Sequence, residues 1–403
     1  MKFSEFNLHE NVMQGIDSMG FQEATPVQEK AIPLILEGKD IIGSAQTGTG
    51  KTAAFLLPII HKIALMPEHD DHIKAIVIVP TRELAVQIDQ QLTGLSYFTS
   101  VSSLAIYGGS DGATFVREMQ ALKKGADIII VTPGRFIAHL NLMYVVLNDF
   151  KYLVLDEADR MLDMGFHDDI MKIISFLPEK RQNLLFSATM PRRILDLANK
   201  ILHDPVHISI AISRPAERVL QMAFIVYDKQ KLALATHILT SKNLHSVIVF
   251  CSTKSSVKSL TRELKKAKLN VEEISSDLEQ KQREKVLVDF RNRKINTLVA
   301  TDVLSRGIDI EDIELILNYD VPNDGEDYIH RIGRTARAES RGVAITLVGE
   351  NEQSTFAEIE KLLGKPVNKA KIPAQLGSGP EYQPGKRRSV NRKRSFDRKK
   401  RKF

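Results

Sequence analysis

Cysteine is nearly absent from this chain of 403 residues, which contains only Cys251. One cysteine excludes internal disulfide bonds and zinc sites built from several thiolates, and it is typical of proteins in a reducing compartment. Long hydrophobic runs are also missing, since the longest, residues 53–60, is far shorter than the roughly 18 residues that a membrane span requires. The N-terminus has acidic residues and no apolar stretch, so we expect no secretory signal. These absences predict a soluble, intracellular protein.

Most of the chain has no excess of basic residues, although the formal net charge of the whole chain is +6. Residues 386–403 hold 11 lysines and arginines and one acidic residue, whereas residues 1–385 hold 45 basic and 49 acidic residues, a net charge of −4. The segment that starts at residue 367 is poor in core-forming side chains before this basic run begins. We therefore predict a disordered basic tail over residues 367–403 behind a mildly acidic globular part.

Short runs of β-branched residues alternate with helical patterns along the chain, which predicts βα units and parallel sheets. Near-continuous apolar strands indicate that helices cover both faces of each sheet. Residues 209–217 have no periodicity and contain a proline, so we predict a linker between two α/β domains of residues 1–208 and 218–366. The expected strands are residues 40–42, 75–79, 103–107, 127–131, 152–155 and 184–186, then 222–226, 247–250, 271–274, 297–300, 315–318 and 344–347.

Residues 45–52, AQTGTGKT, lie between a predicted strand and a predicted helix, which is the setting of a P-loop. Gly48 and Gly50 allow backbone N–H groups to surround a triphosphate, and Lys51 would neutralise its β and γ phosphates. The hydroxyl of Thr52 would bind Mg²⁺. The residues expected to contact the nucleotide here are Ala45, where the general pattern has glycine, and Gln46, Thr47, Gly48, Thr49, Gly50, Lys51 and Thr52.

Residues 156–159, DEAD, follow an apolar strand. A carboxylate at the carboxyl end of a parallel strand faces the crevice where such sheets bind ligands. Asp156 is therefore a candidate to hold Mg²⁺, and Glu157 a candidate to orient or deprotonate the attacking water. Acidic clusters alone usually begin helices, but the P-loop earlier in the chain favours phosphoryl transfer.

Residues 330–337, HRIGRTAR, contain three arginines in an otherwise acidic half of the chain. Arg334 and Arg337 are about one helical turn apart, and a guanidinium group binds phosphate oxygens at two points with a permanent charge. Taken alone, the run also fits a solvated basic helix end.

The P-loop, DEAD, residues 187–189 (SAT) and HRIGRTAR, in this order, resemble the DEAD-box RNA helicases of superfamily 2. The resemblance covers residues 1 to about 366 and implies two RecA-like domains, with ATP and Mg²⁺ as cofactors. It also implies RNA-stimulated ATP hydrolysis that drives domain closure and the local, non-processive unwinding of short RNA duplexes or the remodelling of RNA–protein particles. Further family motifs are GFQEATPVQ (20–28), PTREL (80–84), GG (108–109), TPGR (132–135), VFCST (249–253), QKQR (280–283) and TDVLSRGID (301–309).

The resemblance also assigns roles around the nucleotide. Gln28 would read adenine, because one amide both donates to and accepts from the base edge. Phe3 and Phe21 would stack on or pack around that base, with core packing as the alternative for both, and Asp309 would contact the ribose. Ser187 and Thr189 would couple hydrolysis to domain closure, or simply bond at the strand end. The implied catalytic residues are Lys51, Asp156, Glu157, Arg334 and Arg337.

RNA would bind on the face opposite the nucleotide in both domains, according to the same resemblance. Short polar side chains and backbone N–H groups suit sugar–phosphate contacts, which hold a strand without reading its sequence. The implied RNA-binding residues are Thr81, Arg82, Gly109, Thr132, Gly134 and Arg135 in the first domain and Gln280, Arg283 and Thr301 in the second.

Several alternatives remain at this point. A DNA helicase of the same superfamily, a nucleotide-gated RNA clamp and a non-specific nucleic-acid binder all fit parts of the pattern. Ser305, Ala336 and the pair at residues 275–276 depart from the commonest family form without touching a residue assigned to chemistry. We expect a monomeric, cytoplasmic core without membrane contacts, whose basic tail attracts ribosomal or messenger RNA–protein particles through salt-sensitive phosphate contacts.

Overall fold

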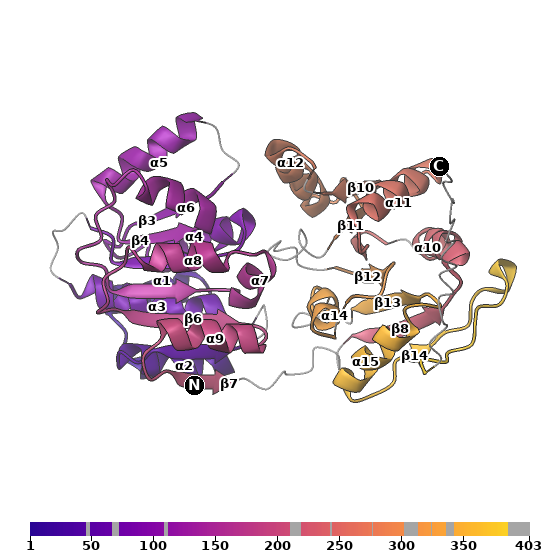
Figure 1. Cartoon of the computed structure of the whole chain (residues 1–403), viewed down its shortest axis with the longest axis horizontal. Coiled ribbons are helices and arrows are strands. Elements are labelled where there is room, and N and C mark those ends of the chain that lie inside the picture. Colours follow the sequence, from indigo (N-terminus) through magenta and orange to yellow (C-terminus); the bar gives the residue numbers. More distant parts are fainter. Residues whose placement is uncertain are drawn as a thin grey trace, which may run out of the picture. The chain divides into compact units, whose positions relative to one another are not determined.

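The computed structural model describes residues 1–45, 49–66, 72–108, 112–209, 219–241, 244–275, 277–301, 313–323, 325–335 and 342–385. These residues form two compact units, one up to residue 209 and one from residue 219 onward (Figure 1). Each unit contains one parallel sheet with helices around it, so the expected α/β class and the presence of two such units are confirmed. None of the described helices has the length and apolar character needed to cross a membrane.

The sheet of the first unit has the strand order β3-β4-β2-β5-β6-β1-β7, and all its described pairs are parallel. The six strands expected from the sequence are present, and β7 is an additional edge strand. The bounds are β1 (Ile41–Ser44), β2 (Ala75–Ile78), β3 (Ser103–Ile106), β4 (Ile128–Val131), β5 (Tyr152–Leu155), β6 (Gln182–Ser187) and β7 (Val206–Ser209).

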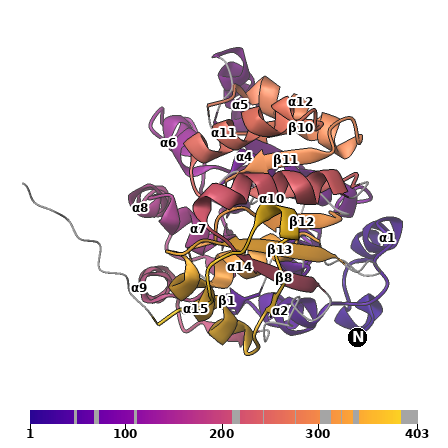
Figure 2. The same ribbon diagram turned by 90° about the vertical axis from the view of Figure 1, so that its right-hand side faces the viewer.

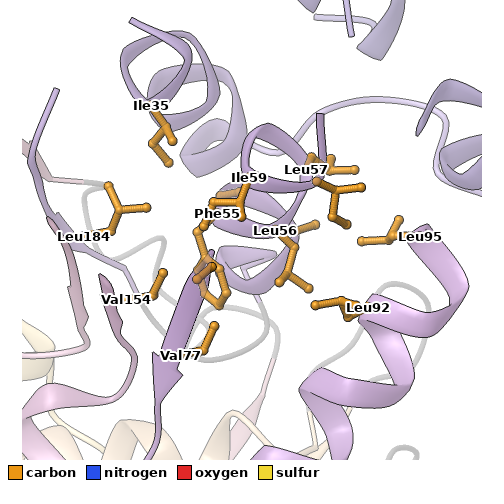
Figure 3. Close-up of a cluster of buried hydrophobic side chains, with 14 of the residues drawn as sticks. Ile35, Phe55, Leu56, Leu57, Ile59, Val77, Leu92, Leu95, Val154 and Leu184 are labelled. Carbon is orange, nitrogen blue, oxygen red and sulfur yellow. The ribbon is translucent and has the colours of Figure 1, made fainter. Parts of the chain in front are cut away.

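Successive strand residues point to opposite sides of the sheet, so both faces of this sheet present apolar side chains. Helices cover both of these faces. Val77 on β2 belongs to one buried cluster and Ile78 to the other. In the first cluster, Phe55 and Leu56 of α3 face Val77 and Leu92 (Figure 3). The helices are η1 (Phe3–Phe6), α1 (Glu10–Ser18), α2 (Pro26–Leu36), α3 (Lys51–Ala64), α4 (Arg82–Leu95), α5 (Gly112–Lys124), α6 (Pro133–Leu140), α7 (Ala158–Asp163), α8 (His167–Ile174) and α9 (Arg192–Ile201).

The second unit repeats this architecture with the strand order β10-β11-β9-β12-β13-β8-β14. Figure 2 labels β11, β12, β13 and β8 in their order across the sheet, in which β9 lies between β11 and β12. Again the six expected strands are present and a short edge strand is added. The strands are β8 (Leu220–Ile225), β9 (Val247–Phe250), β10 (Val271–Ile274), β11 (Thr297–Ala300), β12 (Leu315–Asn318), β13 (Val343–Val348) and β14 (Asn368–Lys369); the helices are α10 (Asp228–Ser241), α11 (Lys254–Lys266), α12 (Gln280–Arg291), α14 (Gly325–Ile332), α15 (Gln353–Leu363) and η3 (Ala374–Leu376).

The prediction of disorder from residue 367 is wrong for residues 367–385, which pack against the second unit. β14 pairs with β8 at the sheet edge, and Ile372 and Leu376 lie against the buried cluster beneath α10. The Tyr382 hydroxyl donates to Glu360 Oε2 at 2.6 Å, and Gln230 Nε2 donates to the Leu376 carbonyl at 2.9 Å. The sequence pattern failed to predict this packing because the segment is held mainly by polar side chains and by backbone bonds to β8. Such contacts leave no hydrophobic periodicity. The basic run at residues 386–403 lies outside the described residues.

This packing predicts that Gly379→Ala destabilises the second unit. A Cβ atom at residue 379 would lie 2.0 Å from the Ile225 carbonyl oxygen at the end of β8, so backbone would have to move. Overpacking of this kind costs about 1–3 kcal/mol of unfolding free energy. Denaturant titration measures the loss, and Gly385→Ala is the matched control because nothing lies within 4 Å of its Cβ position. Equal stabilities for the two variants would contradict the packed segment.

Candidate nucleotide and RNA sites

The P-loop, SAT and DEAD segments meet at one edge of the first sheet. β6 lies between β1 and β5, and Ser44 at the end of β1 is the parallel partner of Ser187 at the end of β6. The Ala45 N–H donates to the Ser187 carbonyl at 3.2 Å. Three segments that are far apart in the sequence are therefore side by side because parallel strands end at the same edge.

Lys51 has the surroundings of a phosphate-binding lysine. It begins α3 directly after Gly50, whose φ of 88° places it in the left-handed region that favours glycine. The Lys51 side chain is 6% exposed, and its Nζ atom has no hydrogen-bond partner among the described residues. A buried ammonium group without a partner is costly. The lysine is thus suited to an anion at the N-terminus of α3, where backbone N–H groups also favour negative charge.

Asp156 and Glu157 lie beyond the end of β5 and are both buried. Burial raises the pKa of Asp156 to about 6, although the nearby Lys51 charge lowers it. Glu157 has a left-handed backbone with φ of 51°, and its Oε2 accepts from Arg160 at 3.1 Å. A cation bound at Asp156 would favour the ionised carboxylate, so this site fits the metal expected from the sequence.

Asp159 joins the DEAD and SAT segments. Its Oδ2 accepts from the Thr189 N–H at 3.0 Å, and its own N–H donates to Ser187 Oγ at 3.3 Å. Ser187 Oγ also donates to the Thr189 carbonyl at 2.8 Å. These bonds connect the acidic segment directly to residues 187–189. No role of Asp159 was expected from the sequence, although its place in the DEAD segment was the available signal.

Gln28 lies next to the P-loop rather than free in solvent. Its Oε1 accepts from the Thr25 N–H at 2.9 Å, and its Nε2 donates to the Gly50 carbonyl at 3.1 Å. Phe3 is buried in the core, with its ring stacked at 6.2 Å from that of the partly buried Phe21. Gln28 thus connects the start of α2 to the start of α3, whereas Phe3 belongs to the buried core cluster and Phe21 packs against that cluster.

The RNA candidates of the first unit occupy the other half of the same sheet edge. Thr81 and Arg82 follow β2, and Thr132, Gly134 and Arg135 follow β4, which is its neighbour in the sheet. The guanidinium group of Arg82 lies 4.5 Å from the Tyr107 ring centroid, and a Cβ at residue 134 would meet open space. Both candidate sets follow carboxyl ends of strands in one parallel sheet, the RNA candidates after β2 and β4 and the nucleotide candidates after β1, β5 and β6.

In the second unit, Thr301 follows β11 and Arg283 lies on α12, which connects β10 to β11. Arg334 follows α14 and is partly buried. The first arginine of HRIGRTAR, Arg331, is buried instead, with its NH1 donating to Asn318 Oδ1 at 3.1 Å and to the Asp320 carbonyl at 3.0 Å. Arg331 therefore fixes α14 against the end of β12, a positioning role that the sequence did not reveal.

The remaining expected site residues lie either at the starts of α3 and α12 or outside the described residues. Thr49 and Thr52 lie beside Lys51 at the start of α3, and Gln280 is the first residue of α12, although its side chain is not described. The residues outside the described ranges are Gln46, Thr47, Gly48, Gly109, Asp309 and Arg337, together with Ser276, Ser305 and Ala336.

The chain matches two family models in sequence: DEAD/DEAH box helicase over residues 25–197 and helicase conserved C-terminal domain over residues 230–339. It is 45% identical over 373 residues to the ATP-dependent RNA helicase CshA of Listeria monocytogenes, covering 92% of this chain and 71% of that protein. The chain belongs to the DEAD-box helicase family. CshA of Bacillus subtilis, a DEAD-box ATP-dependent RNA helicase, is 42% identical over 372 residues, covering 92% of this chain and 74% of that protein.

Solved structures agree with this membership of the DEAD-box family. Dbp5 of S. cerevisiae, bound to RNA and ADP BeF3, is similar with a TM-score of 0.81 and 31% identity, over 91% of this chain and 95% of that chain. The resemblance drawn from the ordered motifs is thereby confirmed, and so is the RecA-like build of both units.

Proposed function

We propose that this DEAD-box RNA helicase hydrolyses ATP at the edge formed by β1, β6 and β5, and that RNA stimulates the reaction. The observation that carries the proposal is the buried Lys51 Nζ, which has no hydrogen-bond partner among the described residues and lies near the buried Asp156. A triphosphate supplies the negative charge that Lys51 requires, and the exposed backbone of a helix start supplies N–H donors. DEAD-box relatives that are named as ATP-dependent RNA helicases support the assignment.

Each residue of the site then has a defined task. Lys51 binds the β and γ phosphates, Glu157 orients the attacking water and accepts its proton, and Gln28 recognises the adenine edge. Thr52 and Asp156 would hold Mg²⁺, which neutralises developing charge on the phosphates when it is bound. Asp159 connects this chemistry to residues 187–189 through its bonds to Thr189 and Ser187. The tasks of Phe3 and Phe21 are to pack the region beside Gln28.

The second unit contributes the arginines of HRIGRTAR. We infer that Arg334 and Arg337 stabilise charge on the transferred phosphoryl group, and that Asp309 contacts the ribose. An RNA strand held by both units would favour the closed state in which ATP is hydrolysed. ATP and RNA would therefore strengthen each other's binding. Closing around a bent strand would separate a short duplex locally, without processive movement.

Strand contacts come from the residues after β2 and β4 and from α12 and the end of β11. Their hydroxyl groups, backbone N–H groups and arginines suit phosphates and sugars, which makes binding independent of sequence. Contacts to the 2′-hydroxyl would distinguish RNA from DNA.

A multiple-turnover phosphate-release assay tests the function. We expect RNA to raise the turnover number by roughly tenfold or more over the protein alone, because the closed state is populated only with RNA. A single-stranded DNA of the same sequence is the control and should stimulate far less. Equal stimulation by DNA would reject RNA specificity, and slow turnover at every RNA concentration would indicate a clamp instead of a helicase.

We also propose that the basic run at residues 386–403 increases RNA affinity without taking part in hydrolysis. Its 11 basic residues in 18 positions add counterion release to binding. Deleting it should raise the dissociation constant for RNA and flatten the dependence of that constant on salt, with turnover at saturating RNA nearly unchanged. Titrations at several salt concentrations measure this, and a large fall in saturated turnover would contradict it.

The remaining parts of the proposal concern the cellular setting. We propose a cytoplasmic protein with a monomeric core that acts on ribosomal or messenger RNA–protein particles. Sedimentation over a range of concentrations tests the monomer, and crosslinking in cells followed by RNA sequencing tests the substrate. Recovery of no crosslinked RNA would overturn the substrate proposal.

A further inference from the structure

A buried polar cluster connects α5 to α6 in the first unit, behind the TPGR segment. Glu118 on α5 is 6% exposed, and His139 on α6 is 0% exposed. One oxygen of Glu118, Oε2, accepts from Arg135 Nε at 2.8 Å and lies 2.9 Å from His139 Nε2. Burial of a carboxylate is unfavourable unless charged or polar groups compensate it, so these two contacts account for the presence of Glu118 here.

The cluster fixes the plane of the Arg135 guanidinium group. Glu118 holds the Nε edge, and the Phe115 ring lies against the flat face, with its centroid 4.7 Å from the Arg135 Cζ atom. A hydrogen bond in the plane and a ring across it leave little rotational freedom. Arg135 thus approaches a ligand with its orientation already set, which lowers the ordering cost of binding.

His139 in turn holds Glu118. An ionised carboxylate only accepts hydrogen bonds, so His139 Nε2 donates to Glu118, and its Nδ1 is hydrogen-bonded to the Tyr144 hydroxyl group. The Phe115 ring stacks on the imidazole with a centroid distance of 4.2 Å and an interplanar angle of 7°. Phe115 therefore contacts both the imidazole and the guanidinium group, and the chain from Tyr144 through His139 to Glu118 is continuous.

We propose that Glu118 and His139 are positioning residues for RNA binding, which hold Arg135 in the orientation that meets the RNA backbone. The proposal rests on the proposed function, in which Arg135 contacts RNA. It assigns to α5 a task that none of the family motifs contains. Neither residue touches RNA; each acts through Arg135.

The first measurement is the RNA concentration that gives half-maximal ATPase stimulation. Glu118→Ala should raise it roughly tenfold, because a charge-assisted hydrogen bond that orders Arg135 is lost. Glu118→Gln keeps one acceptor for Arg135 Nε but places an amide beside His139, so a rise of about threefold is expected. Turnover at saturating RNA should fall less than twofold. Glu179→Ala, which removes an exposed acidic residue of the same unit, is the charge-matched control and should behave as the unmodified protein.

A double-mutant cycle separates positioning from a general structural effect. In the Arg135→Ala background, Glu118→Gln should add no further change, because its effect requires Arg135. An undiminished effect there, or no effect of either Glu118 variant alone, would overturn the proposal. If Glu118→Ala fails to fold, Glu118→Gln and its cycle decide alone. Failure of the proposed function is distinct, since the unmodified protein would then show no RNA stimulation at all.

Discussion

Replacing Lys51 by alanine is expected to lower the affinity for ATP by about 100-fold or more and to abolish hydrolysis. The Nζ atom is buried and has no partner among the described residues, so its charge is available to the phosphates in a site of low polarity. Loss of one partner of a buried charge pair costs roughly 2–5 kcal/mol. A 100-fold change in affinity corresponds to about 2.8 kcal/mol, which lies within this range.

The variant also affects Asp156. The Lys51 charge lowers the Asp156 pKa, which burial holds at about 6. Without that charge, the pKa rises further, so a smaller fraction of Asp156 is ionised near neutral pH and metal binding weakens as well. Both consequences act in the same direction, which makes this one of the two largest effects that we predict.

Titration with a fluorescent ATP analogue measures the affinity, and phosphate release measures the turnover. Lys30→Ala removes an exposed lysine from the neighbouring α2 and should leave both quantities unchanged. Denaturation midpoints show whether the Lys51 variant stays folded; we expect equal or greater stability, since a buried unpaired charge is removed. Affinity within a few-fold of the unmodified protein would refute the assignment of the phosphate site.

Replacing Arg334 by alanine is expected to reduce hydrolysis by roughly 1,000-fold or more while leaving ATP affinity within about threefold. An arginine that meets the transferred phosphoryl group contributes mainly to the transition state, and such arginines are worth 10³–10⁵ in turnover. The nucleotide-binding residues belong to the first unit, whereas Arg334 belongs to the second. Binding and hydrolysis should therefore separate in this variant, unlike in the Lys51 variant.

Single-turnover hydrolysis at saturating RNA measures this effect free of product release. Arg262→Ala is the matched control, because Arg262 is a largely exposed arginine of the same unit. Arg331 is unsuitable for comparison, since its bonds to Asn318 and Asp320 make its loss structural. If the Arg334 variant turned over at a normal rate, the assignment of Arg334 to the transition state would be wrong.

The sequence predicted most of the fold because central strands such as β2, β4, β5 and β9 are continuous apolar runs that are buried on both faces. It missed β7 and β14, which form one edge of each sheet, because neither strand is a run of buried apolar residues. It also predicted disorder from residue 367 onward, although Gln230 and Glu360 hold part of residues 367–385 through polar contacts. Periodicity reports the burial of apolar side chains, and it contains no information about segments held by hydrogen bonds.

The chemistry of the candidate nucleotide site could be predicted from local patterns, because Lys51 begins a helix and Asp156 and Glu157 follow a strand. The sequence did not show that these residues lie close together in the fold. That β1, β6 and β5 are adjacent follows from the strand order, and strand order depends on how crossover connections pack on a sheet. The same is true of the RNA candidates of the first unit, which come together because β2 and β4 are neighbours in the sheet.

The sequence by itself determined the family, the two α/β units and the candidate residues for phosphate binding, because motif spacing preserves local chemistry. Only the tertiary structure decided which polar side chains act on one another. Arg331 is buried against Asn318, Asp159 joins Thr189 to Ser187, and Glu118 holds Arg135 together with His139. Each of these contacts joins residues that are distant in the chain. Their geometry is fixed by packing, and packing leaves no local signature in the sequence.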